Sequence, residues 1–374
     1  MPWKECSAMS ERLELVQLMG QERANVAALC RRFGVSRKSA YKWRKRFKDK
    51  GTAGLKDLSR RPHTSPRQTS ADIQARLLKV RKEHPAWGPR KLRRYLANRQ
   101  VPNLPSPSTI DAILGRHGLI GSEESRKHSP LVRFEYPQPN ALWQMDFKGY
   151  FPVTFGRCHP LCVLDDHSRY ATGLVACVNE RQDQVQQALT GVFRRYGMPQ
   201  AMLMDNGSAW ASHTQLTVWL MRLGVNIRHG RPAHPQTQGK LERFNRTLAA
   251  EAIGSKVYAD VKHCQESFDR WREVYNLHRP HEALDLACPI TRYRPSDKSF
   301  PETLPAIEYG LHDLVLTATR HTGHLLYQSR RWHIGKAFAG LPLAVRPTIT
   351  DGVMHVFFCH QKVAEIDLRQ PCEV

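Results

Sequence analysis

The sequence lacks several features that would place it in other classes of protein. No apolar run approaches the roughly 18 to 20 residues that a membrane span needs, and Met1–Glu5 hold no apolar core of a signal peptide. The nine cysteines are scattered along the chain. Their nearest pair, Cys158 and Cys162, has no second pair or distant histidine pair to complete a zinc site. These absences favour buried thiols in a reducing cytoplasm.

Acidic side chains are few relative to basic ones. The 374 residues include 57 Lys and Arg against 34 Asp and Glu, which gives a net charge of +23. Residues 1–130 hold 29 basic and 11 acidic side chains, a surplus of +18, whereas the remainder holds a surplus of +5. The surplus favours a polyanionic partner, and the length favours two to four domains. A solvated basic surface or a membrane-facing surface is the alternative; helical DNA-binding patterns in the same third of the chain favour nucleic acid.

Residues 1–51 are predicted to form a small helical DNA-binding domain. Apolar residues recur at helical spacing, Gly34 interrupts them, and Ser36 can cap a third helix. A short helix, a glycine-containing turn and a capped helix are typical of a helix-turn-helix. The alternative is a plain three-helix domain with a charged face. The third helix is dense in basic side chains, and five of them are predicted to contact DNA: Arg37, Lys38, Lys42, Arg44 and Lys45.

The next segments are predicted to be a linker and a second helical domain. Residues 52–68 are polar, basic and interrupted by proline, which indicates an extended linker whose Arg60 and Arg61 can enter a minor groove. Residues 69–125 return to helical spacing, with Ser108 as a candidate cap. They are predicted to form a second, more divergent helix-turn-helix or winged-helix-like domain. Its candidate DNA-binding residues are Arg90, Lys91 and Arg93.

Residues 130–285 alternate between strand and helix patterns. Three strand-like runs precede a helix at 181–196, a short strand at 201–204, a further helix and a further strand, which is the order of a ribonuclease H-like fold. Short strand-like runs between turns then predict a small β-barrel over residues 305–374. The expected fold class is therefore multidomain, with all-α helix-turn-helix units, a central α/β ribonuclease H-like core and a C-terminal β-barrel.

Three acidic residues in separate stretches have the character of a metal-dependent nuclease site. Asp146 lies in a strand of bulky residues, where a carboxylate is costly unless a metal or a partner meets it. Taken alone, Asp205 is a turn residue at a strand end, and Glu242 is a favourable charge near a helix N-terminus. Asp165 and Asp166 are rival ligands that a turn between two strands explains. Oxygen ligands that converge from separate elements can hold two Mg²⁺ ions and promote attack on a phosphodiester.

The three stretches together resemble the catalytic core of integrase-like DDE transposases and retroviral integrases. They are Trp143-Gln144-Met145-Asp146, Asp205-Asn206-Gly207-Ser208 and residues 231–248, with 36 residues between Asp205 and Glu242. The helix-turn-helix patterns extend the resemblance to transposases of bacterial insertion sequences. Two features depart from the pattern. The N-terminus has no His-His-Cys-Cys zinc module, unlike retroviral integrases, and Leu241 stands where many relatives have a polar or acidic residue.

The resemblance implies a DNA transposase that binds terminal inverted repeats, cleaves at the 3′ ends and transfers the strands into target DNA. Asp146, Asp205 and Glu242 would be catalytic and would hold two Mg²⁺ ions, for which Mn²⁺ can substitute. The expected partners are double-stranded DNA of the transposon ends and the target, and further copies of the chain in a homodimer or larger oligomer, with no membrane. The expected place is the bacterial cytoplasm, at the nucleoid. Residues expected to hold phosphates beside the catalytic helix are Lys240, Arg243 and Arg246.

Other functions fit parts of the sequence. A non-catalytic, sequence-specific DNA-binding regulator derived from a transposase is the main alternative, and the presence of all three acids argues against it. A ribonuclease H-like nuclease that cuts without joining would need neither the two helix-turn-helix units nor the C-terminal strands. A domesticated transposase whose partner selects the target would have the same motifs and stays open.

Overall fold

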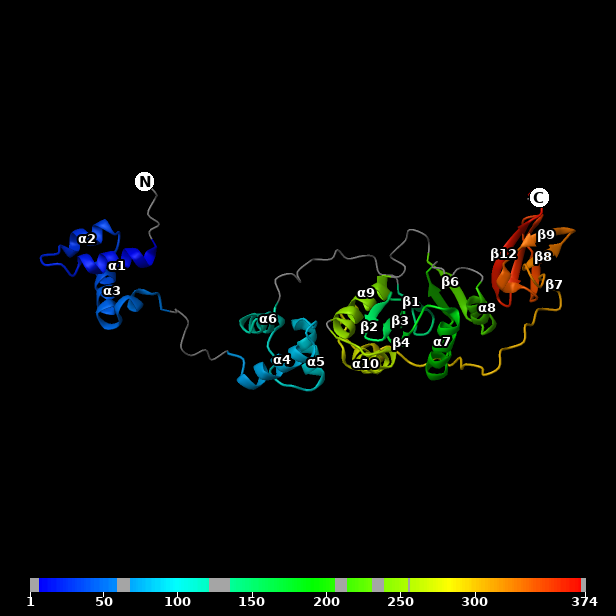
Figure 1. Ribbon diagram of the computed structural model, residues 1–374, viewed down its shortest axis with the longest axis horizontal. Coiled ribbons are helices and arrows are strands. Elements are labelled where there is room, and N and C mark those ends of the chain that lie inside the picture. The colour runs from blue at the N-terminus through cyan, green and yellow to red at the C-terminus, as the bar shows by residue number, and fades with distance from the viewer. Residues whose placement is uncertain are drawn as a thin grey trace. The chain divides into compact units, whose positions relative to one another are not determined.

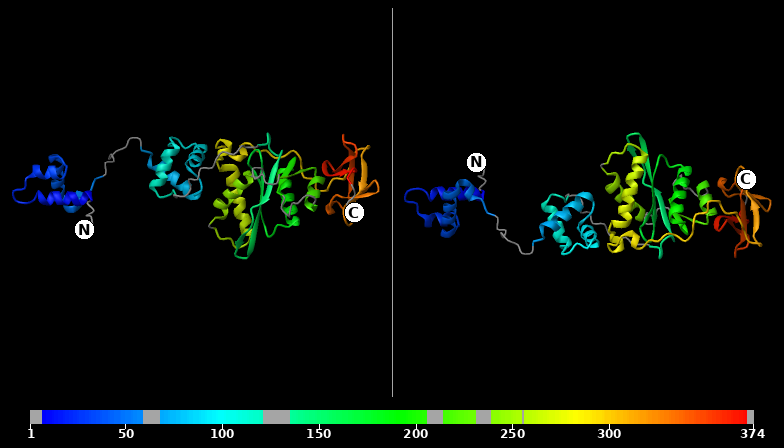
Figure 2. Two further views of the ribbon diagram at one scale, coloured as in Figure 1. Left: turned by 90° about the horizontal axis from the view of Figure 1, so that it is seen from above. Right: turned by 90° about the horizontal axis from the view of Figure 1, so that it is seen from below.

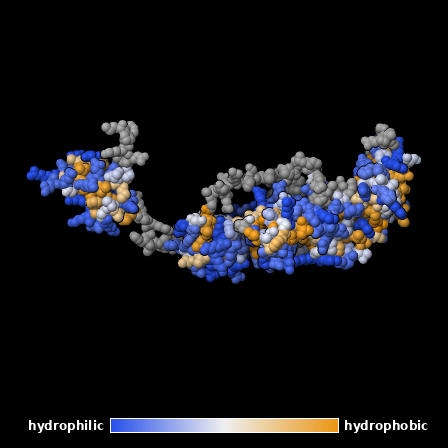
Figure 3. Space-filling model, viewed as in Figure 1, coloured by the Kyte–Doolittle hydropathy of each residue, from blue (hydrophilic) through white to orange (hydrophobic). Residues whose placement is uncertain are grey.

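The structure is a computed structural model that describes residues 7–58, 68–120, 135–205, 214–230, 239–254 and 256–370. The chain divides into two compact units, residues 1–68 and residues 69–374, which Figure 1 colours blue and cyan to red. Hydrophilic residues cover much of the visible face of both units in Figure 3, interrupted by smaller apolar areas. No helix of the described residues is long and apolar enough to cross a membrane.

The described part of the first unit contains the helix-turn-helix that the sequence predicts. Its helices are α1 (Ala8–Leu18), α2 (Val26–Arg32) and α3 (Arg37–Lys50). The turn passes through Gly34 at a φ of +62°, which a glycine adopts without steric cost. The predicted cap is confirmed, because the Ser39 amide donates to Ser36 Oγ at 3.1 Å. The helices enclose a small core in which Leu15, Cys30 and Ala40 are buried.

The expected extended linker is wrong for its first residues. Gly51–Leu55 form a 3₁₀ turn, and Leu55 is fully buried against Val16 and Trp43. The Arg12 guanidinium donates to the Leu55 carbonyl at 2.9 Å and pairs with Asp57 at 2.9 Å. Burying one leucine contributes about 2 kcal/mol, so Leu55 and the contacts of Arg12 together stabilise the folded segment. Arg60 and Arg61 lie outside the described residues.

A second helical domain begins the larger unit. It consists of α4 (Ala71–Glu83), α5 (Pro89–Asn98) and α6 (Pro107–Arg116), packed around a buried Trp87. The predicted cap of the last helix, Ser108, is wrong by two residues. Ser106 accepts from the Thr109 amide at 3.2 Å, and Pro107 occupies the first helical position, where it has no N–H that would need an acceptor. Ser108 is already inside α6.

The central sheet brings the ends of four strands to one edge. β4 pairs with β3, β3 with β1, β1 with β5, and β5 with β6. β3 runs antiparallel to β1 and β4, whereas β5 and β6 are parallel to β1. The C-terminal ends of β1, β4, β5 and β6 therefore share one edge. The strands are β1 (Trp143–Phe147), β2 (Phe151–Val153), β3 (Gly156–Asp165), β4 (Ala171–Cys177), β5 (Ala201–Met204) and β6 (Asn226–His229).

Two pairs of helices cover opposite faces of this sheet, as Figure 2 shows, with α9 and α10 in yellow and α7 and α8 in green. Trp143 and Met145 of β1 belong to the same apolar cluster as Leu189 of α7 and Leu220 of α8. Leu241 and other residues of α9 instead join the cluster of α10. The helices are α7 (Gln182–Tyr196), α8 (Gln215–Arg222), α9 (Gly239–Leu248) and α10 (Val261–Glu273), and the last two each continue as one π-helical turn.

The C-terminal strands lie within the predicted range of residues 305–374, but the closed barrel is not confirmed. In the described residues, an antiparallel sheet of four strands has the order β12-β11-β10-β7, and β8 and β9 form a separate hairpin. β7 and β12 thus remain edge strands. The bounds are β7 (Leu314–Thr317), β8 (His324–Tyr327), β9 (Arg330–His333), β10 (Pro342–Pro347), β11 (Val353–Phe358) and β12 (Gln361–Asp367).

Candidate active site

The two aspartates lie on neighbouring parallel strands at the shared edge. Asp146 is the penultimate residue of β1, and Asp205 directly follows β5. Gln144 pairs with Leu203 in the ladder between these strands. Because both strands advance by two residues per repeat, the same register places Asp146 opposite Asp205.

The alternation of side chains turns Asp146 toward α9. On the neighbouring β3, Cys162 pairs with Asp146 and Leu164 pairs with Gln144. Cys162 and Leu164 both belong to the apolar cluster of α9 and α10. Directly opposite residues of paired strands project from the same face. Asp146 and Gln144 therefore project from the face that α9 covers.

Glu242 lies in the first turn of α9, with its side chain exposed. Leu241 and Phe244 are almost fully buried and hold the helix against the sheet, where α9 contacts β1 and β3. The departure from the family pattern at Leu241 is thus an apolar anchor. A polar residue at this buried position would need a hydrogen-bond partner to offset its desolvation.

The three carboxylates are close enough to affect one another electrostatically. Burial raises the pKa of Asp146 to about 7, and repulsion from Asp205, Glu180 and Glu242 adds to the effect. Among the described residues, no three His, Cys, Asp or Glu side chains are close enough together to enclose a metal ion. The structure therefore places Asp146 and Asp205 side by side at one edge of the sheet, with Glu242 near enough to add to the repulsion on Asp146, and it does not close the three acids into a ligand cage.

Glu180 is a further acid at this edge that was not predicted. It follows β4, whose C-terminal end shares the edge with those of β1 and β5. His159 Nδ1 lies 3.0 Å from Glu180 Oε1. On the other side, His229 at the end of β6 has Nδ1 at 3.2 Å from the Asp205 carbonyl oxygen. An acid after a strand is a weak signal, and only the strand order identifies which strand ends meet.

The two rival aspartates have structural partners. Asp165 is fully buried and accepts from the Asn140 and Ser168 amides, both at 2.7 Å. Asp166 is also fully buried and accepts from the Tyr136 amide at 2.8 Å. Buried carboxylates that accept several short hydrogen bonds have a structural role, because those bonds use the oxygen lone pairs that a metal ion would need. This arrangement supports the interpretation of both residues as turn residues.

The basic residues of α9 differ in what surrounds them. Lys240 has a side chain that is only 16% exposed, and its Nζ lies 2.6 Å from Asp166 Oδ1. Burial lowers the pKa of Lys240 more than this hydrogen bond raises it. Arg243 and Arg246 are exposed, and Arg243 makes a loose ion pair with Glu282 at 3.4 Å. Arg243 and Arg246 therefore present their charge to solvent, whereas Lys240 faces the interior.

The basic residues of the helical domains also divide into two groups. The five predicted DNA-binding residues of α3 are exposed, as are Arg90 and Arg93 of α5. Arg93 donates to the Pro105 carbonyl at 3.1 Å. Lys91 is different, because burial and the nearby Arg279 lower its pKa to about 8. A desolvated lysine beside an arginine of the same unit is poorly placed to meet a phosphate.

Charge on α3 provides a test of DNA binding. Replacing Arg44 or Lys45 by alanine is expected to weaken duplex binding and to lower the slope of log affinity against log salt by about 1 for each phosphate that is no longer neutralised. Fluorescence anisotropy over a salt series measures both quantities. Lys56→Ala, an exposed lysine of the same unit outside α3, is the matched control. Equal effects from all three variants would mean that α3 has no special role in binding.

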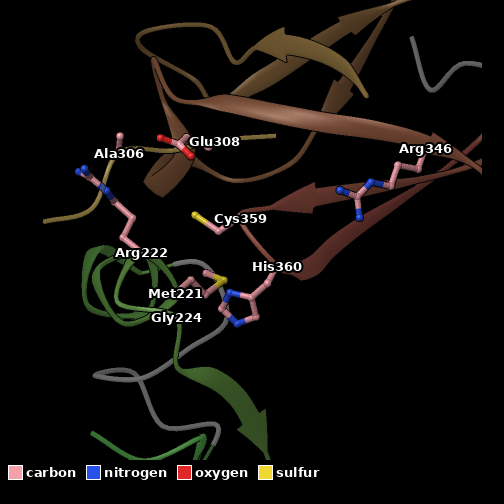
Figure 4. A pocket seen from close by; sticks show the side chains of 8 residues that line it. All are labelled: Met221, Arg222, Gly224, Ala306, Glu308, Arg346, Cys359 and His360. Atoms are coloured by element: carbon pink, nitrogen blue, oxygen red, sulfur yellow. The ribbon is translucent and has the colours of Figure 1, made fainter. Parts of the chain in front are cut away.

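The described residues also line a cavity of about 490 Å³, which none of the predicted site residues lines. It lies between α8 and the C-terminal strands, as Figure 4 shows. Arg222 and Gly224 line it from the side of α8, and Glu308, Arg346 and His360 line it from the C-terminal part. The three acids are therefore separate from this polar cavity.

Models of known protein families match most of the chain in segments. Integrase core domain models match residues 136–235 and residues 223–289. A helix-turn-helix domain model matches residues 11–63, and a homeodomain-like domain model matches residues 39–114. A model of the C-terminal domain of IS481 family transposases matches residues 318–373. The first integrase model includes Asp146 and Asp205, and the second includes Glu242.

Two curated proteins illustrate the similarity. An uncharacterized 31.7 kDa protein of insertion element IS407 from Burkholderia multivorans is 25% identical over 221 residues, which cover 58% of this chain and 79% of that protein. The Gag-Pol polyprotein of Feline leukemia virus is 31% identical over 122 residues, covering 33% of this chain and only 7% of the polyprotein.

Two of the solved structures that match the chain are retroviral. The HTLV-2 integrase catalytic core domain in complex with magnesium, in its trimeric form, has a TM-score of 0.33 at 13% identity and covers 42% of this chain and 97% of that chain. A simian T-cell lymphotropic virus intasome in complex with the PP2A regulatory subunit B56 gamma has a TM-score of 0.37 at 15% identity. It covers 77% of this chain and 99% of that chain.

Proposed function

We propose that this chain, which belongs with the integrase-core transposases of insertion sequences, binds the terminal inverted repeats of its element, cleaves at their 3′ ends and joins them to target DNA. The helix-turn-helix units would bind the repeats, and the exposed basic residues of α3 and α5 would contact phosphates. Two ends must be processed together, so a dimer or larger assembly on DNA is part of the proposal. It would act on DNA of the nucleoid, in the bacterial cytoplasm.

The observation that supports this function best is the convergence of Asp146, Asp205 and Glu242 from three elements. A fold gains nothing from placing a partly buried carboxylate among others, because both desolvation and repulsion oppose its charge. Perturbed acids of this kind concentrate at functional sites. The raised pKa of Asp146 is the measure of that cost.

The donor set fits divalent metal ions. Carboxylate oxygens are the ligands that Mg²⁺ prefers, and positive charge at this edge would relieve the repulsion on Asp146. Asp146 and Asp205 would hold two Mg²⁺ ions with Glu242 completing the set, and Mn²⁺ would substitute. When bound, the ions would activate the attacking hydroxyl and stabilise the leaving 3′-oxygen. The chain's own residues supply the rigid strand register that holds the two aspartates together and the helix that presents Glu242.

A strand-joining assay tests the proposal. The protein is incubated with Mg²⁺ and labelled duplexes that carry the terminal repeats of its element, recovered from the flanking DNA, beside an Asp205→Asn variant. Joined products are expected with the natural chain and not with the variant. Tight end-specific binding without nicking or joining, in Mg²⁺ and in Mn²⁺, would replace the proposal by the regulator alternative. Nicking without joining would favour a simple nuclease.

A further inference from the structure

The buried carboxylate of Asp166 joins two elements that carry the candidate acids. Asp166 Oδ1 accepts from Gln144 Nε2 of β1 at 2.8 Å and from Lys240 Nζ of α9 at 2.6 Å. The Lys240 ammonium also lies 3.4 Å from the Asp166 carbonyl oxygen. One oxygen atom of the turn after β3 thus links β1 to the first turn of α9.

Each partner in this arrangement stands two residues before a candidate acid. Gln144 precedes Asp146 by two positions and projects from the same face of β1. Lys240 precedes Glu242 by two positions in the first turn of α9. Gln144 also pairs in the ladder with Leu203, which precedes Asp205 by two positions. Gln144 therefore shares a face of β1 with Asp146, whereas Lys240 projects from the side of α9 opposite to Glu242. Through Asp166 these two residues tie the first turn of α9 to β1.

The hydrogen bond between Asp166 and Lys240 is directional in a way that the apolar packing of α9 is not. Leu241 and Phe244 press the helix onto the sheet, but hydrophobic contact is non-directional and tolerates small displacements. A 2.6 Å charge-assisted hydrogen bond fixes two atoms within a few tenths of an ångström. Because Asp166 is fully buried and the Lys240 side chain is 16% exposed, little water competes for either group.

We propose that Asp166, together with Gln144 and Lys240, forms a clamp that sets the position of Glu242 relative to Asp146. The clamp is a set of positioning residues, and Lys240 acts through Asp166 instead of through a DNA phosphate. This inference rests on the proposed function for its effect on strand joining. It does not need that function for its effect on metal binding at the three acids.

A double-mutant cycle tests the clamp in the full-length chain. Lys240→Met removes the ammonium, Asp166→Asn removes its acceptor charge, and the third variant combines both. Each single variant is expected to lower the single-turnover joining rate at saturating DNA by about 100-fold, the effect of misplacing a reacting group by about 1 Å. The double variant is expected to be no slower than either single variant, since all three break the same ion pair. Affinity for the DNA ends and its salt dependence should stay unchanged.

Arg246→Met provides the contrasting phenotype on the same helix, because Arg246 is exposed and is a candidate phosphate contact. It is expected to lower DNA affinity and the salt slope. If Lys240→Met behaves like Arg246→Met while Asp166→Asn keeps the natural rate, Lys240 holds a phosphate and the clamp is rejected. Additive reductions in rate across the cycle would reject it as well.

Mn²⁺ binding without DNA separates the clamp from the joining reaction. Electron paramagnetic resonance of free Mn²⁺ is expected to show weaker binding to both single variants than to the natural chain. If the natural chain binds Mn²⁺ but joins no DNA, the proposed function fails and the weaker affinity of the variants still supports the clamp. Unchanged Mn²⁺ affinity in both variants overturns it.

A charge-conserving variant guards against a folding defect. Should Lys240→Met unfold, as circular dichroism would reveal, Lys240→Arg keeps the ion pair but moves its atoms, since the guanidinium is longer and planar. A clamp predicts an intermediate reduction in rate of about 10-fold with unchanged DNA affinity. A phosphate-binding role predicts the full rate, which would reject the clamp.

Discussion

Replacing Asp146 by asparagine is expected to lower strand joining by about 10³-fold. Metal ions supply several kcal/mol of transition-state stabilisation, and each 1.4 kcal/mol corresponds to about tenfold in rate. Asparagine keeps the shape of the side chain but removes the charge that would hold the ions. Gel analysis of joined products in Mg²⁺ measures the effect, and binding of the terminal repeats should be retained because the helix-turn-helix units are unchanged.

Asp183→Asn is the matched control for this substitution. Asp183 is an aspartate of the same domain on the exposed side of α7, where its side chain is 70% exposed and loosely paired with Arg181. It should join DNA at the natural rate, since surface ion pairs contribute at most about 1 kcal/mol. A joining rate for Asp146→Asn equal to that of the control would remove Asp146 from the site.

Without divalent metal, the folded core is expected to lose stability as the pH rises from about 4 to about 7. The pKa of Asp146 is 3.8 in the reference state and about 7 in the fold. Below pH 3.8 the carboxyl is neutral in both the folded and the unfolded chain, so its ionisation does not change the free energy of unfolding. Above the higher value it is charged in both states, and the fold carries the full penalty of about 4 kcal/mol. Thermal unfolding in chelator on either side of this pH window measures the difference in stability.

Asp146→Asn mimics the neutral carboxyl and is expected to be more stable than the natural chain above the window and equal to it below. Mg²⁺ should raise the unfolding midpoint of the natural chain at high pH, because binding to the folded state stabilises it. The variant should show little of this increase. If the stability of the natural chain and that of the variant changed with pH in the same way, Asp146 would not be the group whose pKa is raised in the fold.

Local patterns predicted most of the elements, because their causes are local. Ser36 caps α3 since a hydroxyl at that position meets an orphan amide, whatever the rest of the chain does. The predictions failed where other residues decided the outcome. Leu55 drew the beginning of the linker onto the distant Val16 and Trp43, and Pro107 moved the cap of α6 from Ser108 to Ser106.

The basic residues show the same limit. A lysine within a basic stretch predicts a DNA contact from composition, and this holds as a prediction for the exposed residues of α3. Lys91 and Lys240 stand in similarly basic stretches but are turned inward, toward Arg279 and Asp166. Whether a charge faces solvent depends on which element packs beside it, and that information is absent from a short stretch of sequence.

The sequence by itself determined the chemistry available to this protein: three acids in separate stretches, a basic N-terminal third, and the alternation of strands and helices. These depend on residue type and on spacing along the chain, which are local properties. Only the tertiary structure decided that β1, β4, β5 and β6 end at one edge, that Glu180 joins the acids there, and that Asp166 links Gln144 to Lys240. Strand order and helix docking arise from burial of apolar surface across the whole core, so no single stretch of sequence contains them.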